Sequence, residues 1–374
     1  MTTHVAIAAI AKGHFNEIHV PTEKPQHCEV LLKVEYALMV AFDTYVTDLG
    51  FATDTFPMVL GSNAAGTVVE VGPGVDDLKI GDRACDAMRF RYYVIAFAYQ
   101  GSRSKAMQEY PIQSQTVCAK VHDSLSLASA ATIPDNFVTA FHILFNELDL
   151  PVPKAFPSLE SPPLSSAPIL IYGAGSTAGQ YAIRFLHAAG YKNIIVTASS
   201  KHHEYLASLG ATATIDYRSP SLREDIAKAA GGDGKVVLAV DCFTTEGTVA
   251  EVSKVISQTG TVALLLPIKE GSNVRGEGDA RMHIEIPKGR NSFPKSVNVR
   301  RVRTRLYQEN AFQKENVMPR ILPELLEKGI IQPNRIHLLD KGTFKERVAV
   351  GLDLLRHNKV SGEKLVVKIV KIEV

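Results

Sequence analysis

The chain has 374 residues, of which 45% are hydrophobic and 21% charged, and its formal net charge is +2. This length exceeds what one compact core usually holds, so two domains are expected, and the composition argues against extended disorder. The small net charge disfavours nucleic acid or an anionic membrane as the main partner, and no apolar run reaches the roughly 18 residues that span a bilayer. The four cysteines form no CxxC pair, which favours a reducing, cytoplasmic compartment.

Residues 1 to about 125 contain short β-type runs separated by Gly, Pro and Asp, among them EVLLKVEYALMV, FPMVLGSNAAGTVVEVG and TVCAKV. These runs predict strands, and the turn signals in VGPGVDDLKIGDRA are typical of the corners of a small barrel. A helix is expected in SLASAATIPDNFVTAFHILFNEL, where apolar residues recur at helical spacing. Residues 151–168 then hold six prolines and four serines. They predict an irregular surface loop with no chemistry of its own, since proline lacks the amide proton that helices and central strands need.

From Ala167 onward, predicted strands alternate with predicted helices. The strand runs are PILIYG, NIIVTAS, TATIDY, VVLAVDCF and TVALLLP, which are apolar and β-branched like strands buried on both faces. Such alternation indicates an α/β fold with a doubly wound parallel sheet. The last segment, RVAVGLDLLRHNKVSGEKLVVKIV, predicts a helix, a glycine stop and a final strand. This strand has no obvious place in the parallel sheet, so we expect it to return to the N-terminal domain.

A glycine-rich motif lies between the first of these strands and the helix after it, and its residues are Gly173, Ala174, Gly175, Ser176, Thr177, Ala178 and Gly179. The first glycine permits a tight turn, and the second lets the backbone approach a pyrophosphate. Ala178 or Gly179 then lets the helix pack close to the strand. The helix N-terminus would offer N–H groups to the phosphates. The motif predicts dinucleotide binding; the alternative is a glycine turn in an unrelated α/β fold.

The end of the second strand selects between the two nicotinamide cofactors. An NAD site usually carries Asp or Glu there, whereas this chain has Ser199, Ser200, Lys201 and two histidines beginning with His202. Hydroxyl, ammonium and imidazole groups suit a phosphate dianion, and Tyr217 could close the adenosine side. The loop therefore favours NADPH over NADH. The alternative is a polar loop that only caps the next helix.

The chain resembles the medium-chain dehydrogenase/reductase superfamily, whose first domain is GroES-like. The resemblance rests on PMVLGSNAAGTVVEVGPGV, LKIGDRA, YGAGSTAGQYAIRFLHAAG, LGATATIDYR and GEKLVVKIV, and it covers nearly the whole chain. It implies a GroES-like β-barrel catalytic domain over residues 1–130, completed by about 340–374. It also implies a Rossmann NADPH-binding domain over residues 131–339.

The resemblance also locates the zinc ligands of the metal-dependent members, which are a Cys, a His and a later Cys. The matching positions here hold Val40, Ser62 and a third position near Asp135. A valine and a serine cannot replace a thiolate and an imidazole as Zn²⁺ ligands, so we predict no catalytic metal. The zinc-free branch contains quinone, alkenal and enoyl reductases. Within it, the Pro/Ser insertion and the SS-K-H-H loop look most like fungal members, including stand-alone enoyl reductases that serve polyketide synthases.

By the same match, Thr139 is the first choice for a hydrogen bond to cofactor or substrate; the alternative is a threonine bonded to its own helix backbone. Some enoyl reductases place a Tyr proton donor where this chain has Phe51. Tyr45 is a possible substitute, and the alternative is a core or surface tyrosine.

The match also indicates residues near the cofactor. Leu265 is expected to lie beside the nicotinamide and to contact it mainly through its backbone. Lys364 matches a family lysine or arginine at the cofactor mouth, or it is a solvated lysine before the last strand. Residues 88–110, basic and aromatic, correspond to the substrate-side loop of the family.

These features predict an NADPH-dependent, zinc-independent reductase of the C=C bond of a small-molecule α,β-unsaturated carbonyl, in polyketide or other secondary metabolism. Two alternatives stay open: a carbonyl reductase or dehydrogenase on the same scaffold, and a non-catalytic NADPH-binding protein. An acyl-carrier-bound substrate or a synthase partner is possible, with an arginine cluster at residues 300–305 as the surface for an acidic carrier. Both monomers and homodimers are compatible with this scaffold. Neither the natural substrate nor the proton donor follows from the sequence.

Overall fold

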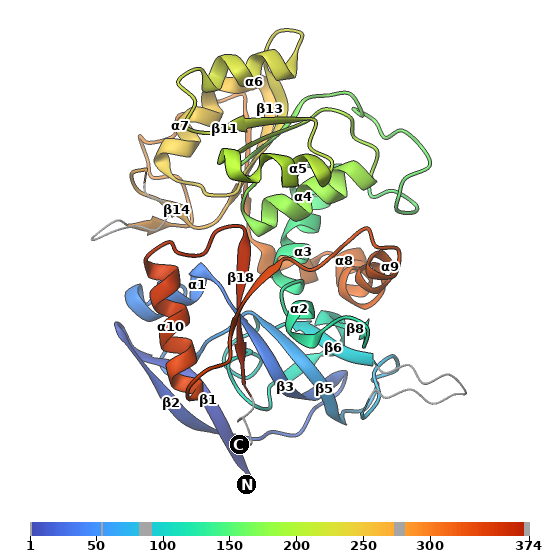
Figure 1. Cartoon of the computed structure of the whole chain (residues 1–374), viewed down its shortest axis with the longest axis vertical. Coiled ribbons are helices and arrows are strands. Elements are labelled where there is room, and N and C mark those ends of the chain that lie inside the picture. The colour runs from blue at the N-terminus through green and yellow to red at the C-terminus, as the bar shows by residue number, and fades with distance from the viewer. Residues whose placement is uncertain (1, 54, 82–91, 273–280, 370–374) are drawn as a thin grey trace. The chain divides into compact units, whose positions relative to one another are not determined.

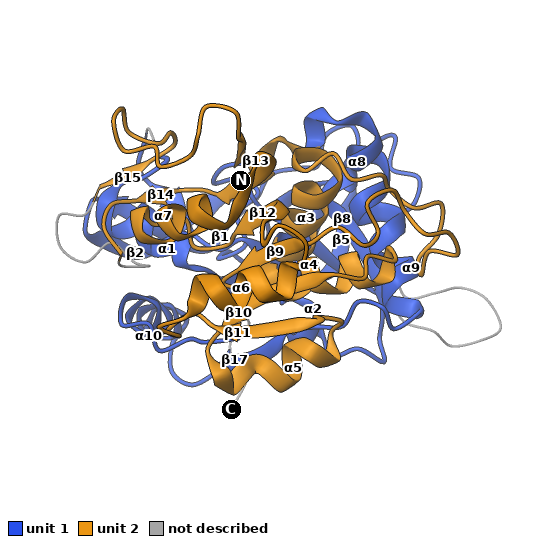
Figure 2. Cartoon of the chain, turned by 90° about the horizontal axis from the view of Figure 1, so that it is seen from above, with its two compact units in different colours: residues 1–135, 308–374 blue, residues 136–307 orange. Residues whose placement is uncertain are grey.

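The computed structural model describes residues 2–53, 55–81, 92–272 and 281–369. Contacts divide the chain into two compact units, which Figure 2 colours separately. Unit 1 comprises residues 1–135 and 308–374, and unit 2 comprises residues 136–307. The α/β class with two domains is as the sequence predicts.

Unit 1 is built mainly of antiparallel strands. Its strands are β1 (Thr3–Ala11), β2 (His14–Pro21), β3 (Glu29–Met39), β4 (Met58–Val59), β5 (Asn63–Val71), β6 (Tyr92–Phe97), β7 (Ile112–Ser114), β8 (Cys118–His122), β17 (Arg335–Leu339) and β18 (Glu363–Lys368). The larger sheet has the order β17-β18-β3-β5-β6-β8, with β7 paired to β3, and a smaller sheet has the order β2-β1-β4. The final strand does return to this unit, because β18 pairs antiparallel with β3.

The helices of unit 1 are short except for the last. They are α1 (Ala41–Thr44), a π-helical turn η1 (Tyr45–Leu49), a 3-10 turn η2 (Gln115–Val117), α2 (Leu127–Ala130), α8 (Ala311–Asn316), a π-helical turn η6 (Val317–Ile321), α9 (Leu322–Glu327) and α10 (Phe344–Arg356). In Figure 1, α10 runs beside β1 and β18. Thr343 caps α10 with a hydrogen bond from the Glu346 N–H, and such a capping box defines a helix start.

Unit 2 is a parallel sheet with helices on it. The strands are β9 (Ile169–Tyr172), β10 (Ile194–Ala198), β11 (Ala213–Asp216), β12 (Val236–Asp241), β13 (Ile256–Leu265) and β16 (Asn298–Val302), with a separate hairpin-like pair β14 (Ile268–Lys269) and β15 (Met282–His283). The sheet order is β11-β10-β9-β12-β13-β16, and every neighbouring pair is parallel. This is the 3-2-1-4-5-6 order of dinucleotide-binding folds. The order reverses between β9 and β12, and ligands of such sheets bind at that point.

The helices of unit 2 connect these strands. They are α3 (Pro134–His142), which begins in unit 1, a π-helical turn η3 (Ile143–Glu147), α4 (Thr177–Ala188), a 3-10 turn η4 (Ser200–His202), α5 (His203–Ser208), α6 (Leu222–Ala230), α7 (Glu246–Val255) and a 3-10 turn η5 (Thr304–Glu309). All residues of β9 and β10 are buried. The apolar, β-branched runs therefore form central strands, as their composition predicts. Residues 151–168 form neither helix nor strand, although Phe156 packs against Phe185 in the core.

Two features differ from the sequence-based expectations. The division between the units falls after residue 307, whereas the prediction returns the chain to the first domain at about 340. The reason is that α9 packs on β8, and β17 forms a parallel pair with β18. The sixth parallel strand, β16, was missed because its arginines obscure the apolar pattern. Two of these arginines form exposed ion pairs, Arg300 with Asp149 at 3.4 Å and Arg301 with Glu285. No helix in the described residues combines the length and apolar character needed to cross a bilayer.

Candidate functional site

The turn between β9 and α4 has the geometry that the glycine motif predicts. Gly173 adopts a φ of +80°, which L side chains rarely reach. Ser176 caps α4, because its hydroxyl accepts a hydrogen bond from the Gly179 N–H at 3.2 Å. The first N–H groups of a helix have no acceptor within it, so the turn presents donors at the positive end of a helix dipole. Such an end is suited to phosphate groups.

Two glycines of the motif exclude a side chain for different reasons. An added Cβ at Gly179 would lie 2.6 Å from the Cα of Ala174, so only glycine lets α4 pack this close to the turn. The sequence left this packing role open between Ala178 and Gly179, and the structure assigns it to Gly179. At Gly175 the nearest atom to an added Cβ belongs to the ring of His202, at 3.3 Å. This contact is tight, but it involves a side chain rather than the backbone, so Gly175 is packed less closely than Gly179.

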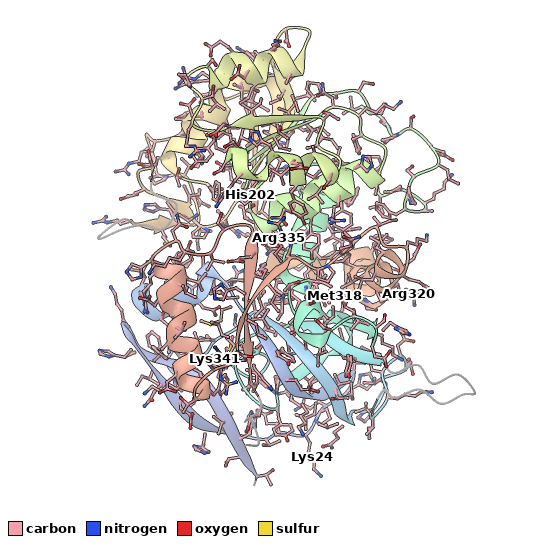
Figure 3. All side chains as sticks on the ribbon, in the orientation of Figure 1. Lys24, His202, Met318, Arg320, Arg335 and Lys341 are labelled. Atoms are coloured by element: carbon pink, nitrogen blue, oxygen red, sulfur yellow. The ribbon has the colours of Figure 1, made fainter. Side chains whose placement is uncertain are left out.

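The polar loop after β10 lies beside the same turn. His202 has only 8% of its surface exposed, and its ring is the nearest neighbour of Gly175. Figure 3 labels the His202 side chain in this unit. Ser200 and Lys201 are exposed, and Ser199 is partly buried. Neither Ser199 nor His202, both in the described part of the chain, caps the following helix through its side chain. The helix-capping alternative for these two residues is therefore wrong.

A carboxylate from the neighbouring strand also reaches this loop, which the sequence analysis missed. Asp216 ends β11 and accepts a hydrogen bond from the Ser200 N–H at 3.2 Å. Arg218 donates to both Asp216 oxygens, at 2.9 and 2.7 Å, and holds the pKa of this carboxyl group well below its usual range. The arginine thus neutralises the carboxylate. Tyr217 is 46% exposed, and the Arg218 guanidinium lies 5.4 Å from its ring centroid.

A buried aspartate and lysine lie at the carboxyl end of β12, next to the point where the strand order reverses. Asp241 accepts hydrogen bonds from the Phe243 and Thr244 N–H groups, at 3.0 and 2.9 Å. Lys269 donates to the Phe243 carbonyl at 2.5 Å. Burial lowers the pKa of Lys269 to about 8, although the charge of Asp241 opposes this shift. The sequence analysis predicted only Leu265 in this region, and this residue ends β13 and is partly buried. It missed Lys269, because no sequence motif indicates it.

Helix α3 carries the predicted catalytic residue Thr139. Its hydroxyl lies 3.0 Å from that of Thr304, and the residue is 6% exposed. The Thr139 hydroxyl thus contacts another side chain, whereas the alternative interpretation expected it to bond only to the backbone of its own helix. One turn earlier, Asn136 accepts a hydrogen bond from the Thr177 hydroxyl at 2.5 Å. This bond connects α3 to the first turn of α4, and so to the candidate phosphate site.

In unit 1, the positions that hold zinc in metal-dependent relatives carry a different set of groups. Val40 has no side-chain donor atom, and Ser62 offers only a hydroxyl. Asp43 lies among them: its carboxylate accepts hydrogen bonds from the Val40 and Gly61 N–H groups, at 2.9 and 2.8 Å. Zn²⁺ in proteins is held by thiolate, imidazole and carboxylate ligands. With the third position, Asp135, already paired to a lysine, the residues present do not fit a zinc ion.

That pair is a buried salt bridge between Asp135 and Lys364. The Lys364 Nζ lies 3.1 and 3.0 Å from the two carboxylate oxygens, and the residues are 6% and 5% exposed, respectively. Asn63 completes the group: its amide donates to Asp135 at 3.3 Å, and its carbonyl accepts from the Asp135 N–H at 3.0 Å. The alternative of a solvated Lys364 is therefore wrong. Contact of Lys364 with the cofactor stays a prediction.

Tyr45, the possible proton donor, lies in the π-helical turn η1 and is 8% exposed. Its ring packs edge-on against Phe42 with a centroid distance of 6.2 Å, and Phe42 packs in the same way against Phe51 at 6.1 Å. The three rings form an aromatic cluster in unit 1. Tyr45 is thus a buried tyrosine, as the core alternative expected, and its role as a proton donor stays a prediction.

Comparison with known proteins places this architecture in a family. A family model described as an alcohol dehydrogenase GroES-like domain matches residues 26–123, and one described as a zinc-binding dehydrogenase matches residues 178–268. The trans-enoyl reductase himH of Aspergillus japonicus is 30% identical over 92% of this chain and 91% of its own length. The trans-enoyl reductase buaC of Petromyces alliaceus is 27% identical over 98% of this chain and 97% of its own. The solved structure of the CurK enoyl reductase has a TM-score of 0.72 at 18% identity, covering 98% of this chain and 99% of that one.

A doubly wound sheet with a phosphate turn, joined to a GroES-like unit that takes back the last strand, is the scaffold of a two-domain dehydrogenase or reductase. The chain belongs to the medium-chain dehydrogenase/reductase family and is enoyl reductase-like. It is an oxidoreductase that uses a nicotinamide cofactor. Although one matching family model is described as zinc-binding, the Val40, Ser62 and Asp135 set does not fit that metal.

The different surroundings of the two glycines predict different defects. Gly179→Ala should lower the free energy of unfolding by about 1–3 kcal/mol, because its Cβ would overlap the Ala174 backbone. Gly175→Ala should destabilise the protein less than Gly179→Ala, because its methyl group meets a side chain rather than the backbone. It should nevertheless bind NADPH more weakly, because the methyl group would keep the pyrophosphate from the backbone. Thermal unfolding and fluorescence titration with NADPH measure the two effects. Wild-type affinity in Gly175→Ala would contradict the phosphate role of this turn.

The buried salt bridge predicts a marked non-additivity. Lys364→Met should lower the free energy of unfolding by about 3–5 kcal/mol, because it leaves the Asp135 carboxylate buried without a countercharge. The double variant Asp135→Leu/Lys364→Met should recover most of that loss. The exposed Lys359→Met serves as a control and should change stability by less than about 0.5 kcal/mol. Denaturant unfolding curves give all four values, and a single variant as stable as the control would contradict the assignment.

Proposed function

We propose that the protein is an NADPH-dependent, zinc-independent enoyl reductase that reduces the C=C bond of a small α,β-unsaturated carbonyl compound. The proposal is supported by two features together: a glycine turn at a helix N-terminus in unit 2, which is suited to phosphate groups, and positions in unit 1 that lack the thiolate and imidazole of a zinc site. Carbonyl reduction by the zinc route requires a Lewis acid, whereas reduction of a conjugated alkene does not. The names of the two trans-enoyl reductases reported above support the same reaction.

The cofactor would be held by unit 2. The turn that contains Gly173, Gly175 and Gly179 would bind the pyrophosphate, which its helix N-terminus and close backbone approach favour. When bound, NADPH supplies the hydride that adds to the β-carbon of the substrate. Leu265 would flank the nicotinamide, and Thr139 would orient cofactor or substrate through its hydroxyl.

The choice of NADPH depends on the loop after β10. Ser199, Ser200, Lys201 and His202 offer hydroxyl, ammonium and imidazole groups to the 2′-phosphate, with Tyr217 toward the adenosine. The bidentate contact of Arg218 with Asp216 supports this choice. It offsets the carboxylate that would otherwise repel the phosphate dianion.

The enone reaction is tested with purified protein, NADPH and a panel of enones, followed by loss of the reduced-nicotinamide absorbance. With NADPH deuterated at the transferred position, we expect the label on the β-carbon of the product. Label on a carbinol carbon would instead establish a carbonyl reductase. Tight NADPH binding and thermal stabilisation, without hydride transfer to any substrate, would establish a non-catalytic NADPH-binding protein.

Cofactor selection is tested at Lys201. Lys201→Ala should raise the KM for NADPH about tenfold, equivalent to about 1.4 kcal/mol, and leave the KM for NADH unchanged, because only NADPH carries the 2′-phosphate. Lys192 is a matched control, since it is exposed but precedes β10 rather than follows it. Lys192→Ala should therefore change neither constant. An equal rise for both cofactors in Lys201→Ala would contradict the proposed phosphate contact.

A further inference from the structure

Lys105 is a partly buried cation beside the former zinc positions of unit 1. Its side chain lies over the ring of Phe42, with the Nζ 6.0 Å from the ring centroid. The charge of Asp43 attracts it, while burial lowers the pKa of its ammonium below the usual value. Within the described residues, no hydrogen-bond acceptor or salt-bridge partner contacts the Lys105 Nζ. A cation held in this way keeps its donors available to a ligand.

The backbone around Lys105 is fixed by hydrogen bonds on both sides. The Lys105 N–H donates to the Gly101 carbonyl at 3.1 Å, and the Lys105 carbonyl accepts from the Gln108 amide at 2.7 Å. The next two residues lie against the loop that precedes β5, where the Met107 N–H donates to the Leu60 carbonyl at 2.9 Å. An added Cβ at Gly61 would lie 2.9 Å from Met107. This close packing holds the segment of Lys105 next to Gly61 and Ser62.

The other charged groups of this region are already satisfied by each other or by the backbone. Lys364 donates to both oxygens of Asp135. Asp43 accepts from the N–H groups of Val40 and Gly61. Lys105 is therefore the cation in this part of unit 1 whose hydrogen-bond donors are not committed among the described residues.

We propose that Lys105 is a catalytic residue that donates a hydrogen bond to the carbonyl oxygen of the unsaturated substrate. This role rests on the proposed enone reduction. When a hydride adds to the β-carbon, the electron pair of the C=C bond moves toward the carbonyl, and negative charge collects on its oxygen. The ammonium of Lys105 stabilises that charge, and a proton from water then adds to the α-carbon. An ammonium group thus performs the electrostatic task that a Lewis-acidic metal performs in zinc-dependent relatives.

The test compares Lys105→Met, which removes the charge and keeps the length, with Lys105→Arg, which keeps the charge. Loss of one preorganised donor to an oxyanion lowers kcat about 100-fold or more, so we expect this fall in Lys105→Met and a much smaller one in Lys105→Arg. The exposed Lys12→Met is the control and should retain wild-type kcat. The affinity for NADPH and the Tm should be unchanged in all three variants.

The isotope effect separates a chemical role from a structural one. With NADPH deuterated at the transferred position, the primary isotope effect on kcat should increase in Lys105→Met, because hydride transfer becomes slower relative to product release. Wild-type kcat in Lys105→Met would overturn the role of Lys105 and leave the enone reaction intact. A lowered Tm in both Lys105 variants, with kcat falling equally, would assign Lys105 to packing and also overturn the proposal. Failure of the wild type to reduce any enone would reject the proposed function, and with it this role.

Discussion

The salt bridge between Asp135 and Lys364 is the interaction on which the arrangement of unit 1 depends. It joins the start of α3 to the last strand, β18, and Asn63 at the start of β5 bonds to the same carboxylate. Its two charges are both buried, and a buried charge is tolerated only when it is paired and hydrogen-bonded. Lys364 lies at the start of β18, in register with Ile336 of β17, and the residues that follow it pair with β3. The position of β18 between these two strands places Lys364 in the interior of unit 1. The carboxylate at a former zinc position is thus paired with a lysine that the last strand supplies.

Asp43 is the second buried carboxylate of this region. It is stabilised by two backbone N–H groups and by the nearby charge of Lys105. Burial nevertheless raises the pKa of Asp43, because desolvation outweighs these contacts. The region thus contains two carboxylates, Asp43 and Asp135, and two ammonium groups, Lys105 and Lys364. It lacks the thiolate and imidazole that hold zinc at the matching positions of metal-dependent relatives.

In unit 2, the order of the strands decides which groups lie beside the loop that follows β10. Because β10 lies between β9 and β11, the loop after β10 meets the glycine turn on one side and the end of β11 on the other. His202 therefore lies against Gly175, while Asp216 bonds to the Ser200 N–H. Selection between the two nicotinamide cofactors cannot be judged from the end of one strand alone. The charge of Asp216 lies beside the same loop, and Arg218 pairs with it.

The sequence by itself determined the α/β class, five of the six parallel strands, the glycine turn between β9 and α4 and the lack of zinc-type ligands at Val40 and Ser62. These depend on local properties: apolar periodicity, the positive φ of Gly173 and the kinds of atoms that side chains carry. Only the tertiary structure decided which distant groups meet, including Lys364 with Asp135, Lys269 with the Phe243 carbonyl, and Lys105 with Phe42. It also revealed β16, whose arginines hide its strand character, and it showed Tyr45 within an aromatic cluster. The physical reason is that a lysine is expected to be solvated when only its sequence context is known. Its role becomes visible only when the fold buries it beside a partner.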